Sequence, residues 1–298
     1  YKYFYVPEGM ESSWDYGEWG GGINRYVTIQ KDTTLSDVWG DKPPIPLSIN
    51  EIQYSDDGPS PYVDQEVKTT GVVTAAGSNG YYLQDGAGEW NGIFVYHDTA
   101  VSRGDVVELT GTVAEYYEMT EITDVTSFEI VGTEPVPAVT EIPTGEMGEP
   151  YEGVLVKFTG ALCTAGPDQY GQSFVNDGSG EVEIENGLYA YPFEENYIYD
   201  ITGVGTFGYG AYEVNPREDA DVELVDSLDM YNVTFEVDMR TDTTGFDPDT
   251  DTVYVAGTMN NWTEPGLDTT WAMHDMDGDT IYSLTREIVD GYHEYKYF

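Results

Sequence analysis

Two short runs of alternating aspartates are the residues of this chain best suited to metal chemistry. The runs comprise Asp275, Asp277 and Asp279 in "DMDGD", and Asp247, Asp249 and Asp251 in "DPDTD". Carboxylates at the first, third and fifth positions of a tight loop provide the oxygen ligands that Ca²⁺ prefers. An EF-hand also needs glycine at its sixth and glutamate at its twelfth position, but here Gly278 is fourth and Arg286 twelfth. We therefore expect hairpin turns that are compatible with Ca²⁺ but require no cofactor.

Side chains arranged for nucleophilic catalysis are scarce in the sequence. It contains no Ser-His-Asp order, phosphate-binding loop, CxxC pair or HExxH word. The single cysteine, Cys163, lies in the apolar run "GALCTAG", which is typical of a buried structural thiol and excludes an intrachain disulfide. In so acidic a chain, the alternative to a lack of catalysis is glycoside hydrolysis by a pair of carboxylates. The sequence predicts a protein that is not an enzyme.

The charge balance restricts the partners of the protein. Acidic residues number 56 against 11 lysines and arginines, a net charge of −45 that repels nucleic acid and anionic lipid. Residues 51–131 contain only Lys68 and Arg103 as basic side chains, so they lack the basic groove of a nucleic-acid-binding barrel. No apolar run reaches the ~18 residues of a membrane helix. We expect an extracellular or cell-surface protein that neither binds nucleic acid nor inserts into a membrane.

The elements that would position these residues are β-strands. Short runs of Val, Ile, Tyr, Phe and Thr alternate with Gly, Asp, Asn and Pro, without a helical period, which predicts an all-β protein. Residues 51–131 and 151–225 repeat one pattern of about five strands, with "DGAG" and "DGSG" as matched hairpin turns. We expect two tandem barrels of the OB type, each preceded by a linker, at residues 41–50 and 132–150. Bends in their strands are predicted at Gly71, Gly111, Gly160 and Gly203.

The first barrel sequence resembles the OB-like region that precedes the nuclease domain of secreted bacterial endonuclease/exonuclease-type proteins. The words "VDQEVKTTGVVTA", "GYYLQDGAGEWNGIFVY" and "GDVVELTGTVAEYYEMTEI" carry the resemblance over residues 50–131, and residues 150–225 match more weakly. The nuclease domain of that family has no counterpart, because His97, His274 and His293 stand in unrelated contexts. The resemblance implies a fold and a secreted setting, without phosphodiester cleavage.

The two ends of the chain carry a second resemblance. Residues 230–298, with "VYVAGTMNNW" and "DMDGDTIYSLTREIVDGYHEYKYF", resemble the first two-thirds of a starch- and glycogen-binding β-sandwich. The words that continue this family, a Trp-containing loop and "NRYVTI", stand in residues 1–40. The word "YKYF" occurs at both ends, at an offset of 295 − 1 = 294 residues. The resemblance implies an Ig-like sandwich divided between residues 230–298 of one unit and residues 1–40 of the next.

The sandwich resemblance also implies a sugar site. In that family two tryptophans stack on pyranose rings and a lysine assists them, because sugars present flat apolar C–H faces to aromatic rings. The matching positions are Trp262, Trp14 or Trp19, and Lys296 or the equivalent Lys2, with Asn261 and Asn24 as partners for hydroxyls. The alternative is a purely structural role for these aromatics.

We interpret the chain as a structural repeat unit of an extracellular filament, surface fibre or adhesive stalk, with OB, OB and sandwich in order. Its units would join head to tail, either as one continuous tandem chain or as separate protomers that complete one another. An open strand edge recruits a further strand, which here would run through Tyr26, Val27, Thr28 and Ile29 and meet Tyr295, Tyr297 and Phe298. The alternative is an array of carbohydrate-binding modules on a secreted enzyme or adhesin, with a polysaccharide as partner.

Overall fold

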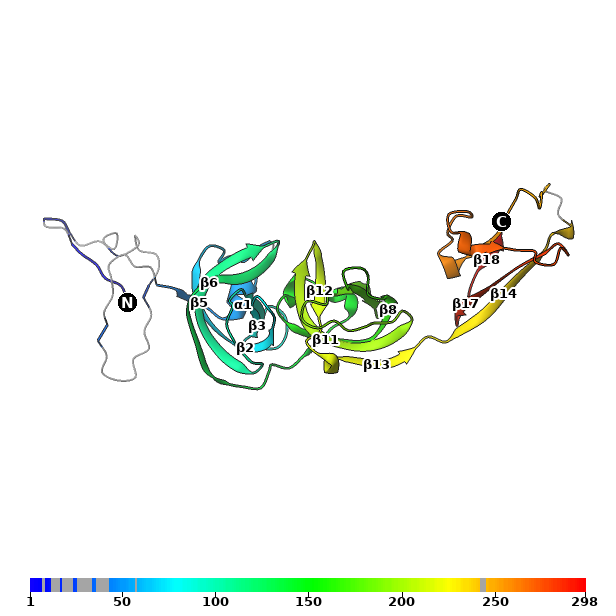
Figure 1. The fold of residues 1–298 in the computed structure, drawn as a ribbon. Helices are drawn as coiled ribbons and strands as arrows, with labels where there is room; N and C mark the ends of the chain where they lie inside the picture. Colours follow the sequence, from blue (N-terminus) through cyan, green and yellow to red (C-terminus); the bar gives the residue numbers. More distant parts are fainter. Residues whose placement is uncertain are drawn as a thin grey trace. The chain divides into compact units, whose positions relative to one another are not determined.

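The fold is known from a computed structural model. It describes residues 1–6, 9–11, 17, 24–25, 34–35, 43–56, 58–241 and 245–298. The predicted all-β fold is confirmed, because these residues form two closed five-stranded barrels and small additional sheets with very little helix (Figure 1). The chain divides into two compact units, Tyr1–Val225 and Asp226–Phe298. No helix among the described residues is long and apolar enough to cross a membrane.

The first barrel closes by pairing its first strand with its fourth. Its strands are β2 (Glu66–Ala76), β3 (Tyr81–Gln84), β4 (Gly92–Val95), β5 (Asp105–Tyr116) and β6 (Met119–Thr133). Around the barrel the order is β2-β3-β4-β6-β5 and back to β2, with β4 and β6 parallel and all other neighbours antiparallel. Alternation along the strands turns one set of side chains inward. The core includes Val73, Leu83, Ile93, Leu109 and Ile122.

The second barrel repeats this order. Its strands are β8 (Leu155–Ala165), β9 (Ser173–Asn176), β10 (Glu181–Ile184), β11 (Tyr197–Gly208) and β12 (Ala211–Asn215). They run β8-β9-β10-β12-β11 and back to β8, again with one parallel pair, β10 and β12. β13 (Val222–Ser227) lies beside β11. Cys163 is buried in this core as predicted, and burial raises the pKa of its thiol to about 11. The identical order in both barrels confirms the internal repeat.

The segments predicted as linkers are integral parts of the barrels. β1 (Ile45–Pro46) pairs in parallel with β2, and the short helix α1 (Ile49–Gln53) buries Ile49 and Ile52 completely in the first core. Before the second barrel, β7 (Thr140–Glu141) pairs in parallel with β8. It is followed by the 3₁₀ helices η3 (Thr144–Glu146) and η4 (Glu149–Tyr151). Proline cannot take part in a central strand because it lacks an N–H, but an edge strand tolerates it. Both short strands, β1 and β7, lie at the edge of their sheets.

The aspartates of the two matched turns anchor these preceding segments. Asp85 Oδ2 accepts a hydrogen bond from Ile49 N at 2.7 Å, and Asp177 Oδ2 accepts one from Thr144 N at 3.1 Å. Burial opposes ionisation of Asp177, but hydrogen bonds from Ser179 and Thr144 outweigh it and lower its pKa to about 2. Each aspartate therefore closes its turn and also ties the incoming chain to its barrel.

Two of the predicted glycine bends coincide with shifts in strand register. Gly160 has a φ of +66° and lies where the register between β8 and β11 shifts. Gly111 lies in β5 at the shift relative to β6, between Thr110 and Thr112. A positive φ is accessible to glycine at low cost, and an extra residue bends the strand as a small barrel requires.

The barrels pack directly on each other through a glycine contact. A Cβ on Gly92 would lie 2.2 Å from the carbonyl carbon of Gly153, which itself has a φ of +70°. This close approach lets Leu155 N donate to Gln84 Oε1 at 2.8 Å across the interface. An apolar cluster spans both barrels and contains Ala75, Tyr82, Met119, Leu155 and Val204. The two barrels accordingly belong to one compact unit.

The C-terminal unit consists of two small sheets that share a core. One sheet pairs β14 (Met230–Asp238) with β17 (Ile281–Val289), and the other has the order β16 (Ala272–Met273), β15 (Val253–Gly257), β18 (Tyr295–Tyr297). Phe235 and Ile288 from the first sheet meet Val253, Val255 and Met273 from the second. This unit also contains the 3₁₀ helices η6 (Met239–Thr241), η7 (Thr258–Asn260) and η8 (Thr269–Trp271), while η5 (Asp219–Asp221) precedes β13 in the barrel unit.

Candidate functional site

The C-terminal copy of "YKYF" uses one edge of its strand. Phe298 exchanges two backbone hydrogen bonds with Tyr254, both 2.9 Å, and Glu294 O accepts one from Thr258 N at 2.9 Å. Because backbone groups alternate in direction along a strand, the N–H and C=O of Tyr295 and Tyr297 point away from β15. β18 is the last strand of its sheet, so this outer edge has no partner strand within the described ranges.

The N-terminal copy of the same word uses the other edge. Tyr1 N donates to Arg25 O and Arg25 N donates to Tyr1 O, both at 2.7 Å, which is an antiparallel hydrogen-bonded pair. Tyr1 corresponds to Tyr295, whose backbone groups point outward. The two copies therefore pair through complementary edges of one strand.

The side chains of the two copies also adopt the same arrangement. The rings of Tyr1 and Tyr3 are edge-to-face with centroids 5.8 Å apart, and those of Tyr295 and Tyr297 are edge-to-face at 5.6 Å. The Arg25 guanidinium lies 5.5 Å from the Tyr3 ring centroid. Arg25 was not among the predicted assembly residues, although the word "NRYVTI" contains it. The predicted residues Tyr26, Val27, Thr28 and Ile29 lie outside the described residues.

The predicted sugar-binding residues of the C-terminal unit lie around the end of β15. Asn261 and Trp262 form a turn with φ values of +51° and +54°, and Trp262 N donates to Gly257 O at 2.8 Å. The Trp262 side chain is 43% exposed, and Lys296 is exposed on the strand next to β15. Asn24 is exposed and Lys2 is half-buried, whereas Trp14 and Trp19 lie outside the described residues. The sugar site stays a prediction.

The first aspartate run forms a loop that satisfies its own carboxylates. Oxygens of Asp275, Asp277 and Asp279 lie within 4.8 Å of one another. Asp275 accepts hydrogen bonds from the backbone N–H of Gly278 at 2.8 Å and of Thr280 at 2.9 Å. Burial opposes ionisation of Asp275, but these amides outweigh it and lower its pKa. The arrangement is that of a hydrogen-bonded turn, and calcium binding there stays a prediction.

The second aspartate run is an exposed turn. Asp247 N donates to Asp251 Oδ2 at 2.9 Å, and Asp249 N donates to Asp247 Oδ1 at 3.0 Å. Within the described part of the chain, these three aspartates do not bring a set of carboxylate oxygens together.

A cavity that the sequence did not indicate lies between the two barrels. It has a volume of about 740 Å³ and is open to solvent. Aromatic rings and carboxylates from both barrels line it, among them Tyr82, Phe94, Phe207, Glu121, Glu185 and Glu213. Burial, reinforced by neighbouring carboxylates, raises the pKa of Glu121 to about 7 and that of Glu213 to about 8.

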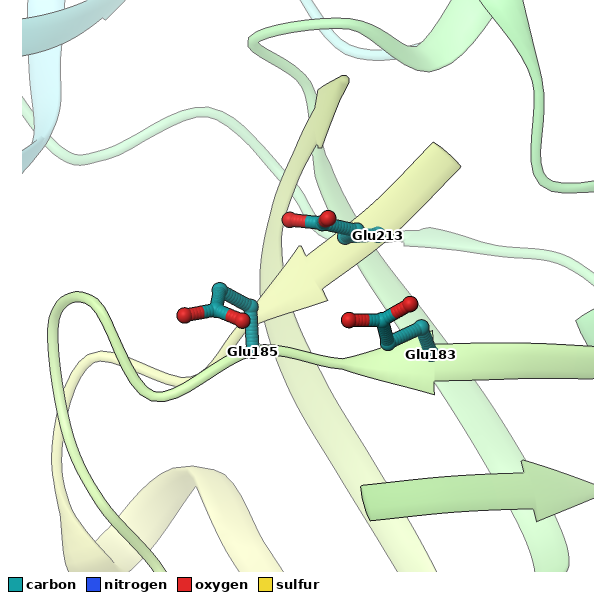
Figure 2. A group of neighbouring side chains, drawn as sticks. All are labelled: Glu183, Glu185 and Glu213. Atoms are coloured by element: carbon teal, nitrogen blue, oxygen red, sulfur yellow. The ribbon is translucent and has the colours of Figure 1, made fainter. Parts of the chain in front are cut away.

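Beside this cavity three glutamates of the second barrel converge (Figure 2). β10 and β12 are parallel and in register, so Glu183 is paired directly with Glu213, and Glu185 follows two residues after Glu183. One carboxylate oxygen from each of the three lies within 4.8 Å of those from the other two. The only signal in the sequence is the alternation "EVEIE" at residues 181–185, which does not indicate Glu213.

Comparisons with known proteins give no family assignment. No protein-family model matches the chain, and no curated protein matches it. Among solved structures, the HINa domain of Ifi202 in complex with 20-bp double-stranded DNA is 9% identical, with a TM-score of 0.29 over 55% of this chain and 97% of that one. A chain from a structure described as structural mimicry for functional antagonism is 10% identical, with a TM-score of 0.27 over 51% and 89%. Likeness at this level carries no functional argument.

Proposed function

We propose that this chain is a structural repeat unit of an extracellular filament or surface fibre, whose units join head to tail by completing a shared β-sandwich. The observation that carries the proposal is the use of complementary edges by the two copies of "YKYF". In one copy Phe298 pairs with Tyr254, and in the other Tyr1 pairs with Arg25. A single strand can make both sets of hydrogen bonds at once, because they use alternate residues.

The same geometry supports a polymer. The N-terminal partner that carries Arg25 and the outer edge of β18 are different surfaces, so their contact is heterologous and adds units without closing on itself unless the rotation happens to form a ring. Exposed strand edges recruit further strands, and backbone hydrogen bonds then supply the affinity. Placing the fibre outside the cell, away from nucleic acid, rests on the net charge of −45.

The proposal predicts that the purified 298-residue chain forms oligomers whose mean size grows with concentration. The reason is that each molecule carries both halves of the joint. Sedimentation velocity over a wide concentration range measures this growth, and an excess of a peptide of residues 1–42 should shorten the oligomers by occupying β18. A chain that stays monomeric throughout, with no binding of that peptide, would remove the proposal.

A second candidate function is binding of an α-glucan by the C-terminal unit. It is supported by the exposed Trp262 in a turn next to the strand that carries Lys296. We expect Trp262→Ala to abolish retardation by starch, glycogen or cyclic dextrins in affinity electrophoresis. The matched control is Tyr292→Ala, which removes another exposed aromatic ring of the same unit. Unretarded wild-type protein, or equal retardation of both variants, counts against this function.

A further inference from the structure

The three glutamates beside the inter-barrel cavity lack partners for their charge. Like charges directly opposite each other on paired strands are destabilising, and Glu183 and Glu213 are such a pair. Among the described residues, no lysine, arginine or histidine forms an ion pair with Glu183, Glu185 or Glu213. The repulsion is therefore not offset by a basic side chain of this part of the chain.

Hydrogen bonding does not compensate the cluster either. Glu213 is only 4% exposed, and its buried Oε1 receives no hydrogen bond from the described protein groups. Oε1 of Glu183 is buried and unpartnered in the same way. Glu185, by contrast, does receive a hydrogen bond: the side-chain amide of Gln172 donates to Glu185 Oε2 at 3.2 Å. Buried carboxylate oxygens without donors are costly unless a ligand satisfies them.

The oxygen geometry fits a calcium ion. Calcium binds six to eight oxygens at 2.3–2.6 Å, so two oxygens on one ion lie at most about 5 Å apart. One carboxylate oxygen from each of the three glutamates meets this limit, because these three atoms lie within 4.8 Å of one another. Water can supply the further ligands that calcium needs, and the adjoining solvent-open cavity offers a route of entry. The aspartate loop at residues 275–279 differs, since its own backbone amides already satisfy Asp275.

We propose that Glu183, Glu185 and Glu213 form a calcium-binding site of the second barrel. The ion replaces the repulsion between β10 and β12 by attraction of both strands to one charge. It also occupies the two carboxylate oxygens that have no donor. This inference is independent of head-to-tail assembly, because all three ligands belong to one barrel of one chain.

Calorimetric titration of CaCl₂ into the full chain tests the site, at about 150 mM NaCl so that weak surface binding is screened. After treatment with a chelator, the wild-type chain should bind Ca²⁺ saturably. Glu213→Gln should weaken binding at least about tenfold, because it removes a ligand charge at constant volume. The matched control Glu181→Gln removes an exposed carboxylate from the same strand and should bind like the wild type.

A thermal melting experiment in EDTA separates a loss of Ca²⁺ binding from an effect of the substitution on folding. Glu213→Gln should melt at the same temperature as the wild type or higher, since it relieves repulsion, and Ca²⁺ should raise only the wild-type melting temperature. Equal Ca²⁺ affinity in wild type and Glu213→Gln would overturn the proposal. The proposal would also be overturned if the wild-type chain bound no Ca²⁺ saturably and Glu213→Gln only made the chain more stable. That result would mean that the three carboxyl groups share protons instead of binding an ion.

Discussion

Tyr295→Pro is expected to weaken head-to-tail assembly about 30-fold or more, whereas Tyr295→Ala leaves assembly in place. Proline removes the N–H that points away from β15, while the bonds of Phe298 and Glu294 to β15 remain. The lost hydrogen bond and the unpaired Arg25 carbonyl together cost about 2 kcal/mol or more, and 1.4 kcal/mol corresponds to a factor of ten.

Alanine is the matched control because it also removes the tyrosine ring, which packs 5.2 Å from Phe235 by ring centroids, but keeps the N–H. A proline on an outer edge is compatible with the strand itself. Sedimentation velocity of both variants of the 298-residue chain gives the association constants. If proline and alanine reduce assembly equally, the outer edge of β18 is not the joint.

The barrel unit is expected to lose stability as the pH rises from 5 to 8, because Glu152 at the barrel interface, like Glu121 and Glu213, has a raised pKa. Glu152 is 2% exposed; its Oε2 accepts a hydrogen bond from Thr120 N at 3.3 Å and its Oε1 has no described donor. Burial, with Glu149 and Glu115 nearby, raises its pKa from the ordinary 4.5 to about 9, despite the opposing hydrogen bond from Thr120.

The direction of this change in stability with pH follows from the number of protons that the folded and unfolded chains bind. Between pH 4.5 and about 9 the folded chain keeps a proton on Glu152 that the unfolded chain has released. The contribution of Glu152 to stability is therefore complete below pH 4.5 and is lost as the pH rises to about 9, at up to about 1.4 kcal/mol per pH unit.

Glu152→Gln should reduce this slope by up to about 1.4 kcal/mol per pH unit, leaving the share of Glu121 and Glu213, and make the barrels more stable than the wild type at pH 8. Urea unfolding of the full chain at several pH values measures the slope, with the exposed Glu146→Gln as control. A wild-type stability that does not fall between pH 5 and 8, or a Glu152→Gln variant with the wild-type slope, would contradict the assignment of a neutral buried carboxyl.

The barrels could be predicted because their signals are local and repeated. Three signals occur in both barrel sequences and indicate the same strand pattern in each. They are the alternation along each strand, the matched "DGAG" and "DGSG" turns, and the glycines within strands. The short elements inside the proposed linkers were not predicted, for a physical reason. Ile49 and Ile52 look isolated in a proline-rich segment, but a helix of only five residues buries both of them. Its anchor, Asp85, is 36 residues away in sequence and also reads as an ordinary turn residue.

The candidate sites were predictable to different degrees. The repeated word at Tyr1 and Tyr295 is visible in the sequence, but the edge that each copy uses depends on strand register, which a single sequence does not give. The glutamate cluster depends on the parallel pairing of β10 with β12, which are separated by β11. Glu183 and Glu213 therefore meet only through the closure of the barrel.

The most direct test of the joint is the backbone pairing in a chain where residues 226–298 run straight into residues 5–42, so that one copy of "YKYF" serves both halves. NMR spectroscopy of this chain should show a backbone contact between Tyr295 and Arg25 and slow amide exchange for both. Phe298 should remain paired with Tyr254. An Arg25 amide that exchanges at the rate of an unfolded chain, with no contact to Tyr295 while β15 and β18 stay paired, would contradict the completed sandwich.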